Sequence, residues 1–298
     1  MPPRPHLRPL HRAAQRVLAG RAADSRGPGL RRFAASSRSA GAAPPEADPE
    51  LPPPPPARWH SDLRARLGRC IQFGCSREQA ARAAAVLRVL AQEWRGLAAG
   101  AEGFLTGDRR GLETQQVVWG EMDSFGHVNN AVYIRYVESA RVNWIVRFAA
   151  ADPAHAGAWR ELMTPRGTGL ILQSITADYK FPMTYPDTIS AYLKLRAPPR
   201  SGDTALALDG VVLSHLHRRA AARTAETVVV YDYAAGRKAP LPPFALAVLR
   251  AEWRRQLAEA RRARARVAAL TADVVALERA TWDREGAVED FGPAPANP

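Results

Sequence analysis

A short stretch in the middle of the 298-residue sequence combines the residue types that cleave an activated ester. Residues 119–130 spell Trp-Gly-Glu-Met-Asp-Ser-Phe-Gly-His-Val-Asn-Asn, and Asp123 lies a few residues before a predicted helix. Asn129 or Asn130 can cap that helix, whose first backbone N–H groups carry partial positive charge. A helix start of this kind can stabilise a carbonyl oxygen that becomes negative during acyl transfer.

A thioester needs little more than these groups, because the thiolate that leaves is a good leaving group. Asp123 can attack the carbonyl carbon or take a proton from water, and neither a serine triad nor a metal is required. An aspartate in a turn often bonds its own backbone, however, so Asp123 also has a purely local interpretation. His127 is either an acid or base, or a hydrogen-bond donor that orders the loop.

The helix after the loop holds two further polar candidates. Asn130 is either a cap of the helix or a contact to the substrate. Glu138 and Arg141 are three residues apart, which is the spacing of a simple ion pair on a helix surface.

The flanking periodicity predicts the elements that position this loop. A short strand over Gln115–Val118 precedes it, and a helix over Asn130–Phe148 follows, with apolar residues at helical spacing. Four alternating, strand-like runs come next: Leu170–Tyr179, Ile189–Arg196, Ala205–His215 and Arg223–Asp232. One strand, one helix and four successive strands predict an α+β fold, in which an antiparallel sheet wraps around a single central helix.

The loop and the helix together resemble the signature of hot-dog-fold thioesterases of the 4-hydroxybenzoyl-CoA and acyl-CoA thioesterase type. The family pattern is aromatic-Gly-Asp-x-Asp-x-x-Gly-His-Val-Asn-Asn, then Tyr and Glu-x-x-Arg. Its second aspartate, the catalytic carboxylate, corresponds to Asp123. Glu121 replaces the first aspartate, and Phe125 stands where a small or different side chain is common. The resemblance covers about residues 114–232.

This resemblance implies roles for eight residues. The catalytic candidates are Asp123, His127, Asn130 and, as a second carboxylate, Glu138; the substrate-binding candidates are Trp119, Gly126, Val128 and Tyr133. Three aromatic residues, Trp119, Tyr133 and Tyr136, have a second interpretation as core. The resemblance also implies an acyl-CoA or another acyl thioester as substrate, no cofactor, and a homodimer or homotetramer whose sheets join edge to edge, with the thioester entering at the subunit interface.

The segments before this domain have a different composition. Residues 1–40 are rich in arginine, alanine and serine, and Asp24 is their only acid, which is typical of a mitochondrial transit peptide; a disordered basic tail is the alternative. Residues 41–60 form a Pro-rich linker. Residues 61–107 are predicted as two helices, the second opened by a capping box at Ser76, followed by glycines that loosen the chain. We expect the protein in the mitochondrial matrix.

The segments after the domain are predicted as a basic helix over residues 241–280 and a disordered tail over residues 281–298. The apolar positions of the helix follow a heptad spacing with a small or polar middle, which predicts a weak coiled coil. Its arginines are most simply a solvated helix face; the alternative is that they bind phosphate, RNA or an acidic partner helix. Without aromatic interleaving or a recognition motif, the net charge of +13 does not favour nucleic acid as a partner.

Composition also limits the chemistry. The sequence has only two cysteines, Cys70 and Cys75, which excludes a disulfide framework and an all-cysteine zinc site. His215 and His217 lack carboxylates at ligand spacing, so no metal is expected. No apolar run approaches the ~18 residues of a membrane-spanning helix.

Two functions follow from these observations. The first is an acyl-CoA thioesterase that uses Asp123 and the helix start to produce an acid and a free thiol. The alternative is a catalytically inactive hot-dog domain that acts as a structural or acyl-binding component of a mitochondrial assembly such as the ribosome, because the extra helices exceed what a minimal hydrolase needs.

Overall fold

The computed structural model describes residues 51–108 and 110–290. Its α-helices are α1 (Trp59–Gln72), α2 (Arg77–Gln92), α3 (Trp94–Gly100), α4 (Asn130–Ala151), α5 (Ala156–Glu161) and α6 (Pro243–Ala280). Its strands are β1 (Gly111–Gln116), β2 (Thr168–Tyr179), β3 (Thr188–Leu195), β4 (Ala205–Ser214), β5 (Arg219–Asp232) and β6 (Arg237–Lys238). None of the helices in these two ranges is long and apolar enough to cross a bilayer. The segment expected as a transit peptide lies outside the described residues.

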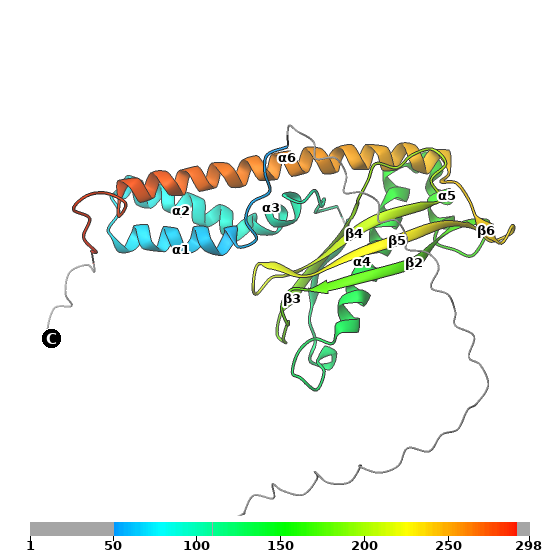
Figure 1. The fold of residues 1–298 in the computed structure, drawn as a ribbon, viewed down its shortest axis with the longest axis horizontal. Helices are drawn as coiled ribbons and strands as arrows, with labels where there is room; N and C mark the ends of the chain where they lie inside the picture. Colours follow the sequence, from blue (N-terminus) through cyan, green and yellow to red (C-terminus); the bar gives the residue numbers. More distant parts are fainter. Residues whose placement is uncertain (1–50, 109, 291–298) are drawn as a thin grey trace, which may run out of the picture. The chain divides into compact units, whose positions relative to one another are not determined.

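The strands form one antiparallel sheet in the order β1-β3-β4-β5-β2, and the short β6 pairs with β5. α4 packs on one face of this sheet (Figure 1) and shares its main core. On β3, alternate apolar residues such as Ile189 and Leu193 belong to this core, because side chains alternate across a strand. The predicted hot-dog arrangement, a sheet wrapped around a central helix, is confirmed.

The contact between α4 and the sheet includes close packing and a buried charge pair. A Cβ atom on Gly210 of β4 would lie 3.0 Å from Val137 Cγ1 of α4, so glycine is required for this close approach. One turn further along α4, the guanidinium of Arg141 donates to the buried carboxylate of Glu226 on β5, with Nη1 2.6 Å from Oε2. These contacts fix the rotation of α4 about its axis, and therefore the position of its first turn.

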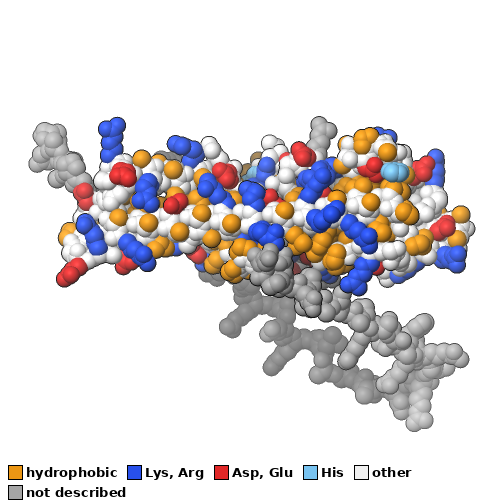
Figure 2. Space-filling model, turned by 90° about the horizontal axis from the view of Figure 1, so that it is seen from above, with side chains coloured by type: hydrophobic (Ala, Val, Ile, Leu, Met, Phe, Trp, Pro, Cys, Tyr) orange, Lys and Arg blue, Asp and Glu red, His pale blue; other side chains and the backbone are white. Residues whose placement is uncertain are grey.

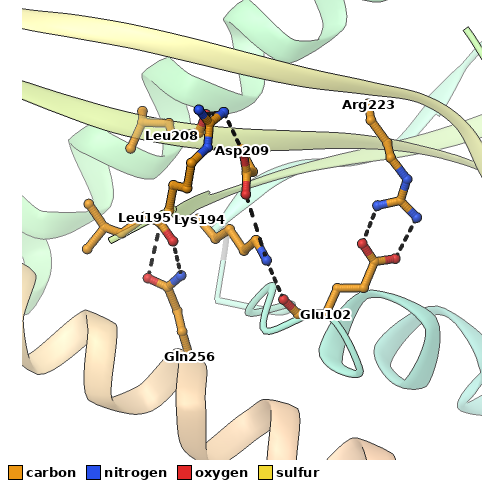
Figure 3. Close-up of polar contacts among 8 residues, drawn as sticks. Glu102, Lys194, Leu195, Leu208, Asp209, Arg223 and Gln256 are labelled. Atoms are coloured by element: carbon orange, nitrogen blue, oxygen red, sulfur yellow. Dashed lines mark hydrogen bonds and ion pairs between the residues drawn. The ribbon is translucent and has the colours of Figure 1, made fainter. Parts of the chain in front are cut away.

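The opposite face of the sheet is covered in part by the helical extension, which consists of α1, α2, α3 and the long α6. Tyr192 on β3 and Val211 on β4 pack there against Trp94 and Phe104. Just after α3, Glu102 forms a two-bond ion pair with Arg223 of β5, and its carbonyl oxygen accepts from Lys194 Nζ at 2.5 Å (Figure 3).

The end of β3 is completed by a side chain of α6. The pairing of β1 with β3 stops at Tyr192, so among the described residues the peptide groups of Leu195 have no strand on that side. Gln256 replaces the strand: its amide donates to Leu195 O at 3.1 Å and accepts from Leu195 N at 3.3 Å (Figure 3). The polar residue in the middle of the α6 seam is therefore a cap for the sheet.

The weak coiled coil predicted for α6 is wrong. Its seam packs against α1, α2 and α3 of the same chain. The small seam residues allow a close crossing with α3: a Cβ atom on Gly100 would lie 3.1 Å from Ala263 Cβ and 2.5 Å from Glu259 Oε1. Gly96 and Gly100, predicted to loosen the chain, instead lie inside α3, because tertiary packing outweighs their low helix propensity.

Other boundaries were predicted with mixed success. The capping box at Ser76 is confirmed: its hydroxyl accepts from Gln79 N, and the Gln79 side chain accepts from Ser76 N. β5 begins at Arg219 rather than Arg223, and β1 begins at Gly111. Residues 281–290 were predicted as disordered tail, but Asp290 N donates to Gln72 O of α1 at 3.0 Å, so this part of the tail contacts the extension.

We predict that the Glu102–Arg223 pair contributes measurably to the stability of the chain. In Glu102→Ala, the half-buried guanidinium of Arg223 loses its acceptor, and we expect the free energy of unfolding to fall by about 2 kcal/mol. Urea denaturation of the full chain measures this change. The control is Glu285→Ala, an exposed residue after α6; equal stability of the two variants would contradict the prediction.

Candidate active site

The loop between β1 and α4 is a small, internally bonded turn. After a short 3-10 helix, η1 (Trp119–Glu121), Met122 and Val128 form an antiparallel bridge. Within it, Asp123 N donates to His127 O at 2.8 Å, and Gly126 N donates to Asp123 O at 3.0 Å. Gly126 has φ +76°, a conformation that favours glycine. This glycine therefore shapes the turn that holds Asp123.

The buried carboxylate of Glu121 ties this loop to α4. It accepts hydrogen bonds from Val118 N at 3.1 Å, from the Tyr136 hydroxyl at 2.5 Å and from Arg135 Nη2 at 3.2 Å. Burial, followed by the bond to Glu121, raises the pKa of Tyr136. The carbonyl of Glu121 also accepts from Asn129 N at 2.9 Å.

This positioning role of Glu121 was not predicted. Its position had been noted only as a departure from the family pattern. Its partners on α4 follow 14 and 15 residues later, and no local spacing rule links them to an acid in the preceding loop.

Asn129, not Asn130, is the cap of α4. Asn129 Oδ1 accepts from Ala131 N at 2.9 Å, and Asn130 is the first residue of the helix. The carbonyl of Asn130 accepts from the Tyr179 hydroxyl of β2 at 3.0 Å. Asn130 therefore lies at the helix start without capping it, which leaves its exposed side chain as a candidate substrate contact.

The segment before β3 is hydrogen-bonded to the same helix start. Met183 N donates to the Tyr133 hydroxyl at 3.0 Å, and Val128 N donates to Met183 O at 2.8 Å. Tyr133 also packs edge to face against Tyr179, with ring centroids 5.3 Å apart. Val128 and Tyr133 are both buried, so the core interpretation of Tyr133 is confirmed, and the same holds for Tyr136.

Asp123 has the local contact that was its alternative interpretation. Its Oδ1 accepts from Phe125 N at 2.9 Å, which fixes the carboxylate within the turn. The side chain is half-buried. Its charge also acts on Tyr133: burial is the largest cause of the raised pKa of this tyrosine, and Asp123 adds to it. The Met122–Val128 bridge closes this turn next to the Asn129 cap, so the turn that holds the carboxylate adjoins the start of α4.

Large apolar side chains surround this loop on the surface. Trp119 is 77% exposed and Phe125 is 83% exposed, so the core interpretation of Trp119 is wrong. The reason is that η1 turns Trp119 outward while the neighbouring Glu121 takes the buried position. Val118, the residue before Trp119, and Tyr185, whose N–H donates to Met122 Sδ of the loop at 3.4 Å, are each 50% exposed. We call Val118, Trp119, Phe125 and Tyr185 the apolar rim.

Glu138 lies apart from the other candidates. It is exposed on α4, about 10 Å along the helix axis from Ala131. Its Oε1 is 4.0 Å from Arg141 Nη2, so the expected ion pair is present as a loose contact beside the stronger Arg141–Glu226 pair. The loop and first turn thus unite seven of the eight predicted site residues, and Glu138 is not among them.

Two cavities lie elsewhere in the described part of the chain, and neither is lined by a residue of the loop. Within residues 51–108 and 110–290, no three histidine, cysteine, aspartate or glutamate side chains are arranged to hold a metal. The chemical groups gathered at the loop are therefore a carboxylate, a helix start, a half-buried imidazole and an apolar rim.

The chain is similar to several proteins of known structure. The PA2801 protein of Pseudomonas aeruginosa is 26% identical, with a TM-score of 0.37, over 46% of this chain and 98% of that one. A thioesterase from Thermus thermophilus, complexed with coenzyme A and Zn, is 23% identical, with a TM-score of 0.36, over 47% and 92%. DHNA-CoA thioesterase from Staphylococcus aureus is 16% identical, with a TM-score of 0.33, over 53% and 90%.

The curated proteins contain no match to the chain. Residues 117–249 match the family model of the thioesterase-like superfamily. This range begins directly after β1, includes the loop, α4 and the other strands of the sheet, and ends within α6. The matched residues thus resemble the thioesterase-like superfamily, and the sheet wrapped around α4 has the hot-dog arrangement.

Proposed function

We propose that the chain is an acyl-CoA thioesterase that hydrolyses its substrate to a carboxylic acid and free coenzyme A. The match to the thioesterase-like superfamily supports thioester hydrolysis in general. The observation that carries the specific proposal is the fixed turn that holds Asp123 near the first turn of α4. A carboxylate and a polarising helix start are the two groups that thioester cleavage requires.

In the proposed reaction the thioester carbonyl oxygen lies at the start of α4. The Asn130 N–H has no hydrogen-bond acceptor among the described residues, so it is free to donate to this oxygen. Asp123 then either attacks the carbonyl carbon or takes a proton from an attacking water. Attack expels the thiolate and leaves an anhydride that water hydrolyses; the base route forms the acid directly. Both routes end in an acid and a thiol.

The proposed active unit is a homodimer or a homotetramer. β2 is an edge strand: within the described residues it pairs only with β5, and half-buried Leu170, Leu172 and Ile175 lie along it. An unpaired edge and an exposed apolar rim both support association with a second copy. Glu138 would contribute to catalysis only across such an interface.

We propose the mitochondrial matrix as the location, on the basis of the arginine-rich, acid-poor residues 1–40.

The alternative function, a non-catalytic component of a mitochondrial assembly, is favoured by the helical extension. Figure 2 shows the arginines of α6 spread along an exposed face with acidic residues among them. Migration of the tagged chain with a large ribonucleoprotein particle during sedimentation would support this alternative, whereas a small mitochondrial oligomer would support the hydrolase.

The mechanism predicts that Asp123→Asn lowers kcat by about 100-fold or more, because the amide is neither a base nor a nucleophile. Release of free thiol from acyl-CoAs of several chain lengths measures this loss. Asp273→Asn, at an exposed position of α6, is the matched control and should keep full activity. Unchanged turnover in Asp123→Asn would reject the assigned role.

Glu121 is predicted to act as a positioning residue. In Glu121→Ala, the buried Tyr136 hydroxyl and the Val118 N–H lose their acceptor, and we expect the free energy of unfolding to fall by about 2 kcal/mol. Activity should fall through kcat more than through KM, because the loop that holds Asp123 loses its support. Glu161→Ala, an exposed acid in α5, is the control. Wild-type stability in Glu121→Ala would contradict this assignment.

A further inference from the structure

A cavity of about 420 Å³ lies where the helical extension meets the sheet, away from the Asp123 loop. The elbow between α2 and α3, residues 92–97, forms one wall. The other walls come from Thr106, Thr114 of β1, His215 after β4, and Arg262 of α6. The cavity is therefore built jointly by the extension and the hot-dog domain, and it falls within the volume range of small-molecule sites.

Arg95 in this cavity is half-buried and has no acceptor. Within residues 51–108 and 110–290, its guanidinium forms no hydrogen bond and no ion pair. By contrast, the other lining arginine, Arg262, donates to both carboxylate oxygens of Glu259, at 2.8 and 2.6 Å. A partly desolvated guanidinium without an acceptor is a binding partner for an oxyanion.

His215 is held beside Arg95. Its Nε2 lies 2.9 Å from the hydroxyl of buried Ser190, which also accepts from Thr114 N at 3.2 Å. The ring of Trp94 packs on the imidazole edge to face, with centroids 5.3 Å apart. The imidazole is therefore fixed in the cavity wall by contacts to β3 and α3, and Thr114 of β1 in turn holds Ser190.

Arg95 and His215 line the same cavity, and the charge of one acts on the other. Burial lowers the pKa of His215, the charge of Arg95 lowers it further, and Asp187 opposes both. An anion bound to Arg95 would therefore also lie close to the imidazole.

The second cavity, of about 240 Å³, provides a contrast. Its charged groups bind one another: Glu102 pairs with Arg223, and Lys194 Nζ contacts both the Glu102 carbonyl and Asp209 Oδ2, the latter at 3.9 Å (Figure 3). These contacts join the extension to the sheet, and the remaining charged lining residue, Asp178, pairs with Lys180 at 3.7 Å, so each charged group that lines this cavity has a partner.

We propose that the first cavity binds a small metabolite through its oxyanion group, a phosphate or a carboxylate, which lies between Arg95 and His215. The hydroxyl of Thr106 and the amide of Gln92 offer further polar contacts, and Trp94 offers a flat apolar wall. Glu93 also lines the cavity, and its carboxylate repels an anion, so the anionic group binds on the Arg95 side. The site does not depend on the proposed thioesterase activity.

Binding at this site is linked to pH. The charged groups that face His215 or line the cavity are Arg95, Asp187, Glu93 and Arg262. A bound anion stabilises protonated His215 and raises its pKa. By linkage, the affinity for the anion increases as the pH falls through the interval between the two pKa values.

Titration calorimetry of the full chain with sodium phosphate, and separately with sodium acetate, tests the proposal at constant ionic strength. We expect Arg95→Gln to weaken binding about tenfold or more. Arg95→Lys, which keeps the charge, should retain part of the affinity. Arg254→Gln, at an exposed position of α6 outside the cavity, should bind like the wild type.

The two salts distinguish the headgroup: preference for phosphate indicates a phosphorylated ligand, and preference for acetate indicates a carboxylate. Absence of binding of both salts, or equal affinity in Arg95→Gln and wild type, would overturn the proposal. If Arg95→Gln does not fold, the His215 imidazole signal of the wild type, assigned with His215→Gln, decides by NMR. A raised His215 pKa in the binding salt supports the site, and an unmoved pKa overturns it.

Discussion

A buried carboxylate must find hydrogen-bond donors, and this constraint on Glu121 organises the candidate active site. Its donors come from the strand end before the loop and from the second turn of α4. Because the Glu121 carboxylate accepts hydrogen bonds from both sides, it joins the loop to the helix. The bonds of Glu121 thereby position the turn that carries Asp123. The cap at Asn129 determines where the free N–H groups of the helix begin.

The two faces of the sheet are stabilised by different means. The inner face packs on α4 through apolar side chains, the close approach at Gly210, and the Arg141–Glu226 pair. The outer face is joined to the extension by specific polar contacts of Glu102 and Gln256 in addition to apolar packing. The helices outside the superfamily match are consequently part of one packed structure with the hot-dog domain.

This architecture separates two kinds of chemistry. The loop before α4 offers a carboxylate and a helix start beside an exposed apolar rim, which suits an acyl thioester. The junction behind the sheet offers an unpaired guanidinium and a fixed imidazole, which suits an oxyanion. The second site requires the extension, whereas the groups of the first lie entirely within residues 117–249, which match the superfamily model.

Local periodicity was enough to predict the central helix and the four strands after it, because alternation and helical spacing are properties of short segments. The chemical loop was predicted from the residue types in it and from its resemblance to a family signature. The choice between Asn129 and Asn130 as cap, the exposure of Trp119 and the packing roles of Gly96 and Gly100 were decided by tertiary structure. The partners of Glu121 and Gln256, and the shared cavity of Arg95 and His215, were equally unpredictable. Each of these features depends on groups that folding brings together from separate parts of the chain. The pattern of a single segment does not predict which distant groups will be in contact.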